Sequence, residues 1–243
     1  MTIGVLDGGL HPSQVYQRPL RLGAYAEFTQ EKLEGGNWQL LSRVWPQEAL
    51  ARLLLQPLRG LGPWKSPRGH GTEILSIFQK LAPQATILWG KVLDEEGEAS
   101  EESVLTGLQW LGEQKPDFIS LSLGCEEVFQ RCRWEETMES LIQGGAQVYA
   151  ALGARSSWPS CLPKIHRVCD NSLFQSYPFH PDFPGGKLRI LDPKILEDLG
   201  KETSTSLATA AWVALEASKR MKGHLHRSSA HDTITNHENT CRN

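Results

Sequence analysis

The sequence predicts an α/β fold in which a mostly parallel central sheet carries helices on both faces. Short apolar runs alternate along the chain with stretches whose apolar residues have helical spacing, and this order is typical of a parallel sheet. The length of 243 residues, 40% of them hydrophobic, is enough for one large domain that folds without a disulfide or a metal. Ligands of such folds bind beyond the carboxyl ends of the strands, so the functional residues are expected there.

The expected strands are short apolar segments that end at glycine or another turn-forming residue. They are residues 2–6, 85–93, 118–123 and 147–152. The expected helices have apolar residues three and four positions apart. They are residues 72–80, 100–114, 134–143 and 206–221, and Ser100 is expected to cap the second. Residues 10–69 are rich in Pro, Gly and Arg and are expected to be irregular, apart from a helix over 47–55.

Composition and the chain ends narrow the class of protein. The net charge of −3 argues against nucleic-acid binding, and no apolar stretch is long enough to span a membrane. The N-terminus has no basic leader or cleavage site, and the five cysteines are odd in number without a C-x-x-C pair, so a cytoplasmic protein with reduced thiols is expected. Residues 222–243 are polar and contain four histidines. We expect a disordered tail after a domain over residues 1–221, with a metal-binding tract as the weaker alternative.

Three polar residues stand at the ends of expected elements, in the order Asp, His, Ser. Asp7 follows the first strand, His70 precedes the first helix, and Ser206 begins the last, Ala-rich helix. Each position alone has an ordinary structural explanation, but the combination points to nucleophilic catalysis. A serine hydroxyl attacks only when a base takes its proton, and histidine is that base when an aspartate orients its ring. A helix N-terminus also favours the negative charge that develops on an attacking oxygen.

The segments around these residues resemble the subtilisin family (subtilases, S8 peptidases). The matching segments are Ile3-Gly4-Val5-Leu6-Asp7-Gly8-Gly9, Gly69-His70-Gly71-Thr72, Lys91-Val92-Leu93, Ile119-Ser120-Leu121-Ser122-Leu123-Gly124 and Thr205-Ser206-Leu207-Ala208-Thr209. The resemblance covers nearly all of residues 2–220 except 10–68 and about 165–203. It implies a subtilisin-like three-layer fold and a serine endopeptidase that uses Asp7, His70 and Ser206, an acyl-enzyme intermediate and no cofactor.

The same resemblance implies where a substrate binds. In the family an extended peptide adds a strand between two enzyme segments. Those segments correspond here to Gly97, Glu98 and Ala99 and to Ser122, Leu123 and Gly124, with Ala151, Gly153 and Ala154 near the scissile bond. Acidic residues flank the first two segments and favour basic substrate residues, whereas Arg155 favours an acidic or polar group at the cut. The sequence leaves the preference open, with a solvated acidic loop as the simpler interpretation of the carboxylates.

Several positions depart from the family pattern. Ala154 stands where the family has an oxyanion-hole Asn, and Gly8 stands where a hydroxyl residue is usual. Ser204 and Ala210 replace the usual Gly and Pro around the nucleophile. The helix after His70 has no room for the loop that holds the family's tightest calcium site, so no metal is expected. No propeptide is expected before Asp7, which implies control by low intrinsic activity, restricted expression or an activating or inhibiting protein partner.

Three functions remain open from the sequence. The first is hydrolysis of an intracellular peptide or protein substrate. The second is a catalytically weak or inactive module that keeps the peptide-binding groove. The third, an α/β ligand-binding domain of another kind, is less favoured because the chain has no Gly-rich phosphate loop.

Overall fold

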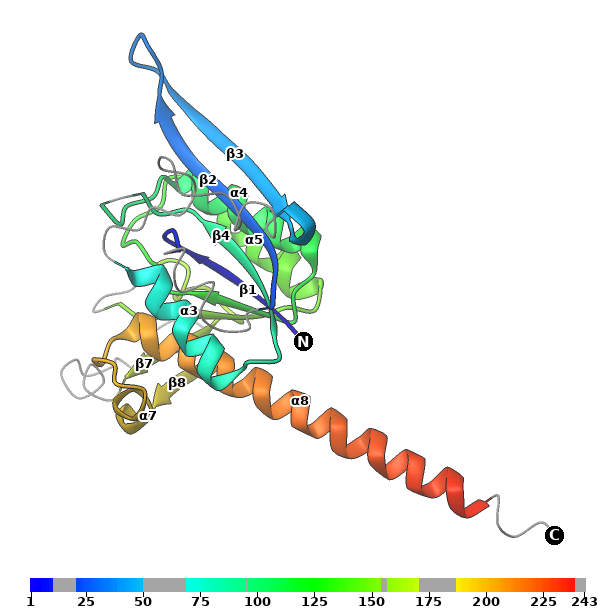
Figure 1. Cartoon of the computed structure of the whole chain (residues 1–243). Helices are drawn as coiled ribbons and strands as arrows, with labels where there is room; N and C mark the ends of the chain where they lie inside the picture. Colours follow the sequence, from blue (N-terminus) through cyan, green and yellow to red (C-terminus); the bar gives the residue numbers. More distant parts are fainter. Residues whose placement is uncertain (11–20, 50–68, 95, 154–156, 171–186, 239–243) are drawn as a thin grey trace.

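The computed structural model describes residues 1–10, 21–49, 69–94, 96–153, 157–170 and 187–238. Its centre is an eight-stranded sheet in the order β3-β2-β4-β1-β5-β6-β7-β8 (Figure 1). The strands are β1 (Thr2–Asp7), β2 (Arg21–Lys32), β3 (Trp38–Pro46), β4 (Thr86–Lys91), β5 (Phe118–Leu121), β6 (Gln147–Ala151), β7 (His166–Asp170) and β8 (Leu188–Leu191). Only the β2–β3 pair is antiparallel, so the expected mostly parallel sheet is confirmed.

Helices cover both faces of this sheet. They are α3 (His70–Leu81), α4 (Glu101–Gln114), α5 (Arg131–Gln143), α7 (Pro193–Asp198) and α8 (Thr205–Glu238). Buried side chains of α3 and α8 join one apolar core with the sheet, and those of α4 and α5 join a second core on the opposite face. The expected three-layer arrangement is therefore confirmed.

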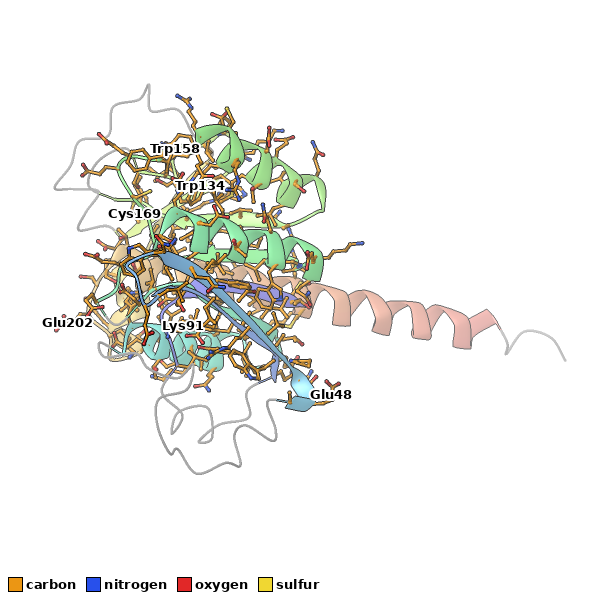
Figure 2. The ribbon with its side chains drawn as sticks, turned by 90° about the horizontal axis from the view of Figure 1, so that it is seen from above. Glu48, Lys91, Trp134, Trp158, Cys169 and Glu202 are labelled. Carbon is orange, nitrogen blue, oxygen red and sulfur yellow. The ribbon has the colours of Figure 1, made fainter. Side chains whose placement is uncertain are left out.

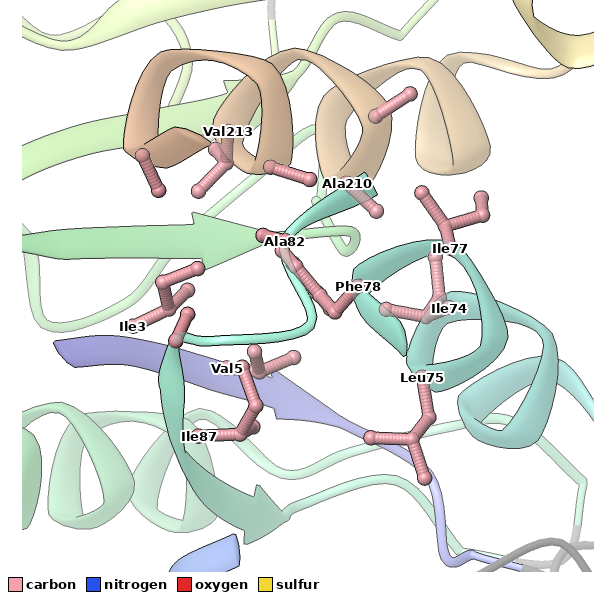
Figure 3. Packing of buried hydrophobic residues seen from close by; sticks show 14 of the residues in the cluster. Ile3, Val5, Ile74, Leu75, Ile77, Phe78, Ala82, Ile87, Ala210 and Val213 are labelled. Atoms are coloured by element: carbon pink, nitrogen blue, oxygen red, sulfur yellow. The ribbon is translucent and has the colours of Figure 1, made fainter. Parts of the chain in front are cut away.

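The core beneath α3 and α8 brings two of the candidate catalytic elements together. Figure 3 shows Ile3 and Val5 of β1 facing Phe78 of α3 and Val213 of α8. The buried face of α8 is rich in fully buried alanine, as at Ala210, which lets the helix approach its neighbours closely. This packing fixes the N-terminal end of α8 relative to that of α3, where Ser206 and His70 lie.

The four strands and four helices expected outside residues 10–69 are present, with small shifts at their ends. The strand expected over 118–123 ends at Leu121, and the helix expected over 72–80 begins earlier, at His70. Ser100 caps α4 as expected, because its hydroxyl accepts a hydrogen bond from the Ser103 N–H at 3.1 Å.

The expectation that residues 10–69 are irregular is wrong for the described part of that segment. β2 and β3 form a long antiparallel hairpin that reaches beyond the other strands (Figure 1). The turn uses Gly35 and Gly36, whose positive φ angles of 107° and 88° suit glycine. Small and apolar residues that alternate along β2, such as Ala24 and Phe28, pack into the α4 side of the sheet. Of the helix expected over 47–55, residues 47–49 are helical and the rest lie outside the described residues.

The expected tail also differs from the structure. The backbone of α8 continues to Glu238, so residues 222–238 are helical where no folded structure was expected. A helix satisfies its backbone hydrogen bonds internally, and it therefore extends past the last residue that packs on the sheet without needing further partners. The division of the chain at residue 221 into a peptidase domain and a tail stays a prediction. Within the described residues, no helix is long and apolar enough to cross a membrane.

Calcium is not expected to stabilise this protein. α3 runs without interruption from His70 to Leu81, and the described residues contain no group of three or more acidic, His or Cys side chains suited to a metal. A bound ion that contributed 1 kcal/mol would raise the melting temperature of a domain of this size by about 2–4 °C. We expect a chelator to lower it by less than about 2 °C, measured by calorimetry with calcium added back as the control. A larger, calcium-reversible drop would contradict this expectation.

Candidate active site

Asp7 and His70 meet at the carboxyl end of β1. Asp7 is the last residue of β1 and is fully buried, and His70 is the first residue of α3. The His70 Nδ1–H donates to Asp7 Oδ1 at 2.8 Å, and the backbone N–H of Gly8 donates to the same oxygen at 2.7 Å. The aspartate thereby fixes the ring orientation of His70 and leaves Nε2 as the nitrogen available to a substrate or a nucleophile.

This contact changes the basicity of the histidine. The hydrogen bond to Asp7 raises the pKa of His70 above its usual value of 6.5, partial burial lowers the pKa, and the charges of Asp7 and Glu73 raise it further. The net result is a raised pKa, so the imidazolium that forms during proton transfer is stabilised. His70 therefore has the electrostatics of a general base that holds its proton well once it has taken it.

Gly71 allows α3 to start directly against the turn that follows β1. A Cβ atom at Gly71 would lie 2.8 Å from the carbonyl oxygens of Gly8 and Gly9. The Gly8 oxygen also accepts a hydrogen bond of 3.0 Å from Trp89 Nε1–H, which fixes the turn to β4. The absence of a side chain at Gly71 is therefore what places His70 over Asp7.

The Gly71→Ala protein is expected to be less stable and less reactive. Its methyl group meets backbone atoms that cannot move aside, so α3 must shift, at about 1–3 kcal/mol of unfolding free energy. The shift separates His70 from Asp7, and labelling of the protein by a serine-reactive probe should fall at least tenfold.

Gly223→Ala is the matched control for this change. Gly223 lies in α8 with open space around it, so alanine there should raise helix stability by up to about 1 kcal/mol and leave labelling unchanged. Denaturant unfolding and labelling rate measure the two effects. A Gly71→Ala protein as stable and as reactive as wild type would contradict the account of the helix start.

Ser206 lies in the first turn of α8, on the far side of the site. Its hydroxyl donates to the carbonyl oxygen of Ser122 at 3.0 Å, and the Ser122 hydroxyl donates to the carbonyl oxygen of Ser206 at 3.1 Å. No hydrogen bond joins Ser206 to His70 in the described part of the chain. In proteins without bound substrate, catalytic hydrogen bonds are often long or incomplete. As a candidate nucleophile, Ser206 would have to give up its hydrogen bond to Ser122 before another group could take the proton of its hydroxyl.

Two cavities open beside these residues. The larger one, of about 790 Å³, is lined by Asp7 and His70 and by residues 97–99 and 122–124. The smaller one, of about 270 Å³, is lined by Ser206, by residues 122–124, and by Ala151 and Gly153. The structure thus brings the substrate-binding residues expected from the sequence to one continuous surface, except Ala154, which lies outside the described residues.

The aromatic part of the larger cavity is not predicted by the sequence patterns. Trp134 of α5 and Phe129 also line this cavity, and Trp134 lies against Trp158 with ring centres 6.4 Å apart (Figure 2). Trp134 Nε1–H donates to Glu101 at 2.8 Å, so one of the cavity's carboxylates has a structural role. The helical spacing around Trp134 marks a buried face but not which cavity that face borders.

The larger cavity has an acidic lining. Asp94, Glu98, Glu101 and Glu127 border it, and the described lining residues include no lysine or arginine. Asp94 accepts hydrogen bonds from the backbone N–H groups of Glu96 and Glu98, so its charge also holds the loop in place. Arg155, which pointed to the opposite preference, lies outside the described residues.

Three solved structures with a similar architecture are named as proteases. A lanthipeptide protease matches 92% of this chain and 75% of its own chain with a TM-score of 0.58 at 16% identity. The prenylagaramide maturation protease PagA matches 92% of this chain and 78% of its own with a TM-score of 0.53 at 18% identity. A cold-adapted subtilisin-like serine proteinase matches 91% of this chain and 75% of its own with a TM-score of 0.53 at 15% identity. The chain has a subtilisin-like fold.

Sequence comparison supports the subtilisin-like resemblance over a limited segment. The minor extracellular protease Epr of Bacillus subtilis (strain 168) is 31% identical over 70 residues. This match covers 25% of the present chain and 11% of that protein. No protein-family model matches the chain.

Proposed function

We propose that this subtilisin-like protein is a serine endopeptidase that cleaves peptide bonds with Asp7, His70 and Ser206. The observation that carries the proposal is the hydrogen bond of 2.8 Å between buried Asp7 and His70, at the carboxyl end of the sheet and at the wall of the larger cavity. The likeness to protease structures supports the same reaction class. Ser206 borders the adjoining cavity at the start of α8, where a nucleophile would meet the scissile bond.

The proposed reaction has two halves. His70 Nε2 takes the Ser206 hydroxyl proton while the oxygen attacks the substrate carbonyl carbon, and the carbonyl oxygen becomes an anion. The backbone N–H of Ser206 is the proposed donor to that anion. His70 then gives its proton to the leaving amine, which leaves an acyl group on Ser206. A water molecule enters, gives a proton to His70 and attacks the acyl carbon. His70 then passes this proton to the departing Ser206 oxygen, so the carboxylic acid product leaves and the Ser206 hydroxyl is restored.

The proposed substrate is an extended peptide or an unfolded segment of an intracellular protein. Two of the structural neighbours are named as proteases of a lanthipeptide and of prenylagaramide maturation, and this supports a peptide precursor as the substrate class. Residues 97–99 and 122–124 border the same cavity and would hold such a peptide between them. Cys125, Cys132 and Cys169 are thiols that form no disulfide, which supports a cytoplasmic location. An activating or inhibiting protein partner belongs to the same proposal.

A second candidate function is a silent peptide-binding module. It is favoured by the hydrogen bond that holds the Ser206 hydroxyl on the Ser122 carbonyl and by Ala154 at the oxyanion position. Labelling with a fluorophosphonate probe separates the two functions, because the probe reacts with an activated serine and needs no knowledge of the substrate. Stoichiometric labelling of wild type supports the enzyme. The silent module becomes the better account when neither wild type nor a variant with a restored oxyanion donor reacts.

Ala154→Asn is that variant, and it is expected to react at least ten times faster than wild type. A side-chain donor that meets the oxyanion at about 2.7–3.1 Å contributes about 2.7–4 kcal/mol to the transition state, a value known from a subtilisin. Ala154→Leu is the matched control, since leucine resembles asparagine in size and has no donor. An equal gain in both variants would attribute the effect to side-chain volume. A fast wild type with no gain in Ala154→Asn would mean that another group, with Ser157 and Asn171 as the nearest in sequence, already fills the role.

A further inference from the structure

A buried ion pair lies beside the candidate catalytic aspartate and has no role in the proposed reaction. Lys91 Nζ of β4 lies 2.9 Å from Glu27 Oε1 of β2, and the two side chains are only 9% and 8% exposed (Figure 2 labels Lys91). Burying two charges is unfavourable unless their attraction and hydrogen bonds repay the lost hydration, and apolar residues are often as stable in such places. The pair therefore calls for an explanation beyond stability.

Strand register places this pair next to Asp7. Lys91 is the register partner of Asp7 on one side and of Glu27 on the other, so the three residues form a row across β1, β4 and β2. Two residues before them stand Val5, Trp89 and Tyr25, which all belong to the core beneath α3 and α8. Alternate residues of a strand share a face, so the side chains of Asp7, Lys91 and Glu27 point to that same face.

Asp7 lacks a hydrogen bond that its burial calls for. Its Oδ1 accepts from Gly8 and His70, whereas its buried Oδ2 accepts no hydrogen bond within the described part of the chain. Gly8 supplies no hydroxyl that could reach this oxygen. A buried carboxylate with an unpartnered oxygen is destabilised in its charged form, unless a positive charge lies nearby. Lys91, on the adjacent strand and the same face, is a buried cation in register with Asp7.

We propose that Lys91 is a positioning residue for the candidate triad, held beside Asp7 by Glu27. Its buried positive charge offsets the negative charge of Asp7, and it thereby moderates the basicity that Asp7 gives to the histidine. The inference rests on the proposed function for its catalytic meaning. The electrostatic effect of Lys91 and Glu27 on the Asp7–His70 pair does not depend on whether the protein turns over a substrate.

Other charged groups also lie near His70 and contribute to its electrostatic environment. Asp7 faces it from β1, Glu73 lies one turn further along α3, and Asp94 and Glu98 border the same cavity from the loop after β4. Glu73 is exposed and paired with Lys201 at 3.1 Å, so solvent screens its effect. The Lys91–Glu27 pair is buried, unlike Glu73, so water screens its charges less.

The test measures the pKa of His70 by NMR titration of protein with ¹⁵N-labelled histidine, assigned with His70→Gln. Lys91→Met leaves the Glu27 charge, so the pKa of His70 should rise by about 0.5–1 unit. Glu27→Gln leaves the Lys91 charge, so the pKa should fall by a similar amount. The acid limb of the probe-labelling rate should follow, moving to higher pH in Lys91→Met and to lower pH in Glu27→Gln. Lys164→Met, which breaks an exposed ion pair with Glu139, is the control. It should shift neither the pKa of His70 nor the acid limb of the labelling rate.

Opposite shifts in the two variants support the proposal, because a purely structural disturbance moves the pKa the same way in both. Shifts of equal sign, or no shift beyond that of Lys164→Met, overturn it. An unpaired buried charge can prevent folding, so Lys91→Met/Glu27→Gln is the second variant. This double variant loses both charges. Lys91 on β4 is nearer to Asp7 on β1 than Glu27 on β2 is, so the loss of the ammonium should dominate. The pKa of His70 should therefore rise, though by less than in Lys91→Met. An unchanged pKa in the folded double variant also overturns the proposal. Failure of both wild type and Ala154→Asn to react with the probe would sink the proposed function and leave the titration result standing.

Discussion

The Ser206→Ala protein should not be labelled by a fluorophosphonate probe, and its peptidase turnover should fall by roughly 10⁶-fold. The probe bonds to the hydroxyl oxygen of the activated serine, and alanine removes that oxygen. The fold should persist, because Ser206 contributes one hydrogen bond to the Ser122 carbonyl and lies at the start of a long helix. Mass spectrometry of the labelled protein and denaturant unfolding measure the two effects.

Ser204→Ala is the matched control for this prediction. The Ser204 hydroxyl accepts a hydrogen bond of 3.1 Å from the Leu207 N–H, so it caps the start of α8. Its loss should lower the unfolding free energy by about 1 kcal/mol and leave labelling intact. The nucleophile assignment would be sunk by a Ser206→Ala protein that labels as well as wild type, or by a Ser204→Ala protein that alone stops labelling.

Asp7→Asn is expected to reduce the labelling rate by about 10⁴-fold with little change in backbone structure. The carboxylate accepts the His70 Nδ1–H at 2.8 Å, whereas an amide presents its NH₂ group to the ring. His70 then carries its proton on Nε2, where it cannot accept the proton of Ser206. Crystal structures or NMR tautomer shifts of the variant check the ring state. Labelling within tenfold of wild type would remove Asp7 from the mechanism.

The same variant should change how stability depends on pH. The folded protein raises the pKa of His70 above the value of 6.5 that an unfolded chain has. The folded state therefore binds that proton more tightly, and the stabilisation is fully present below pH 6.5 and is lost as the pH rises through the folded-state pKa. Asp7→Asn removes the main cause of the shift, so it should destabilise the protein more at pH 5 than at pH 9. A stability difference that does not vary with pH would contradict this.

The parts of the fold predicted from sequence are those with strong local signals. The buried run before Asp7 and the helical spacing after His70 identify β1 and α3, and the Ala-rich segment after Ser206 identifies α8. The hairpin of β2 and β3 was missed because its apolar residues alternate with charged and polar ones and are broken by Gly23. The Gly35-Gly36 turn between two aromatic-containing segments was the signal that could have found it.

The sequence indicates candidate site residues, but it does not indicate the contacts that they make. Position at the end of an element places Asp7 and His70 at the same edge of the sheet, and their hydrogen bond follows from that. No local pattern indicates that the Ser206 hydroxyl lies on the Ser122 carbonyl, since this contact joins residues 84 positions apart. The row formed by Asp7, Lys91 and Glu27 depends on β4 lying between β1 and β2. This neighbour relation could not be predicted, because the sequence does not identify β2 as a strand.

The order of the strands in the sheet also determines when the candidate site can exist during synthesis. Asp7 lies in a central strand, yet its partners on the catalytic surface include the start of α8, almost 200 residues later in the chain. At about 5–20 residues per second, a ribosome needs roughly 10–40 s to make that stretch. α8 supplies much of the core beneath α3, so a nascent chain carries His70 and Asp7 before Ser206, their candidate nucleophile, is made. Under the proposed function, ribosome-bound chains that stop before residue 205 should therefore not cleave their own exposed segments.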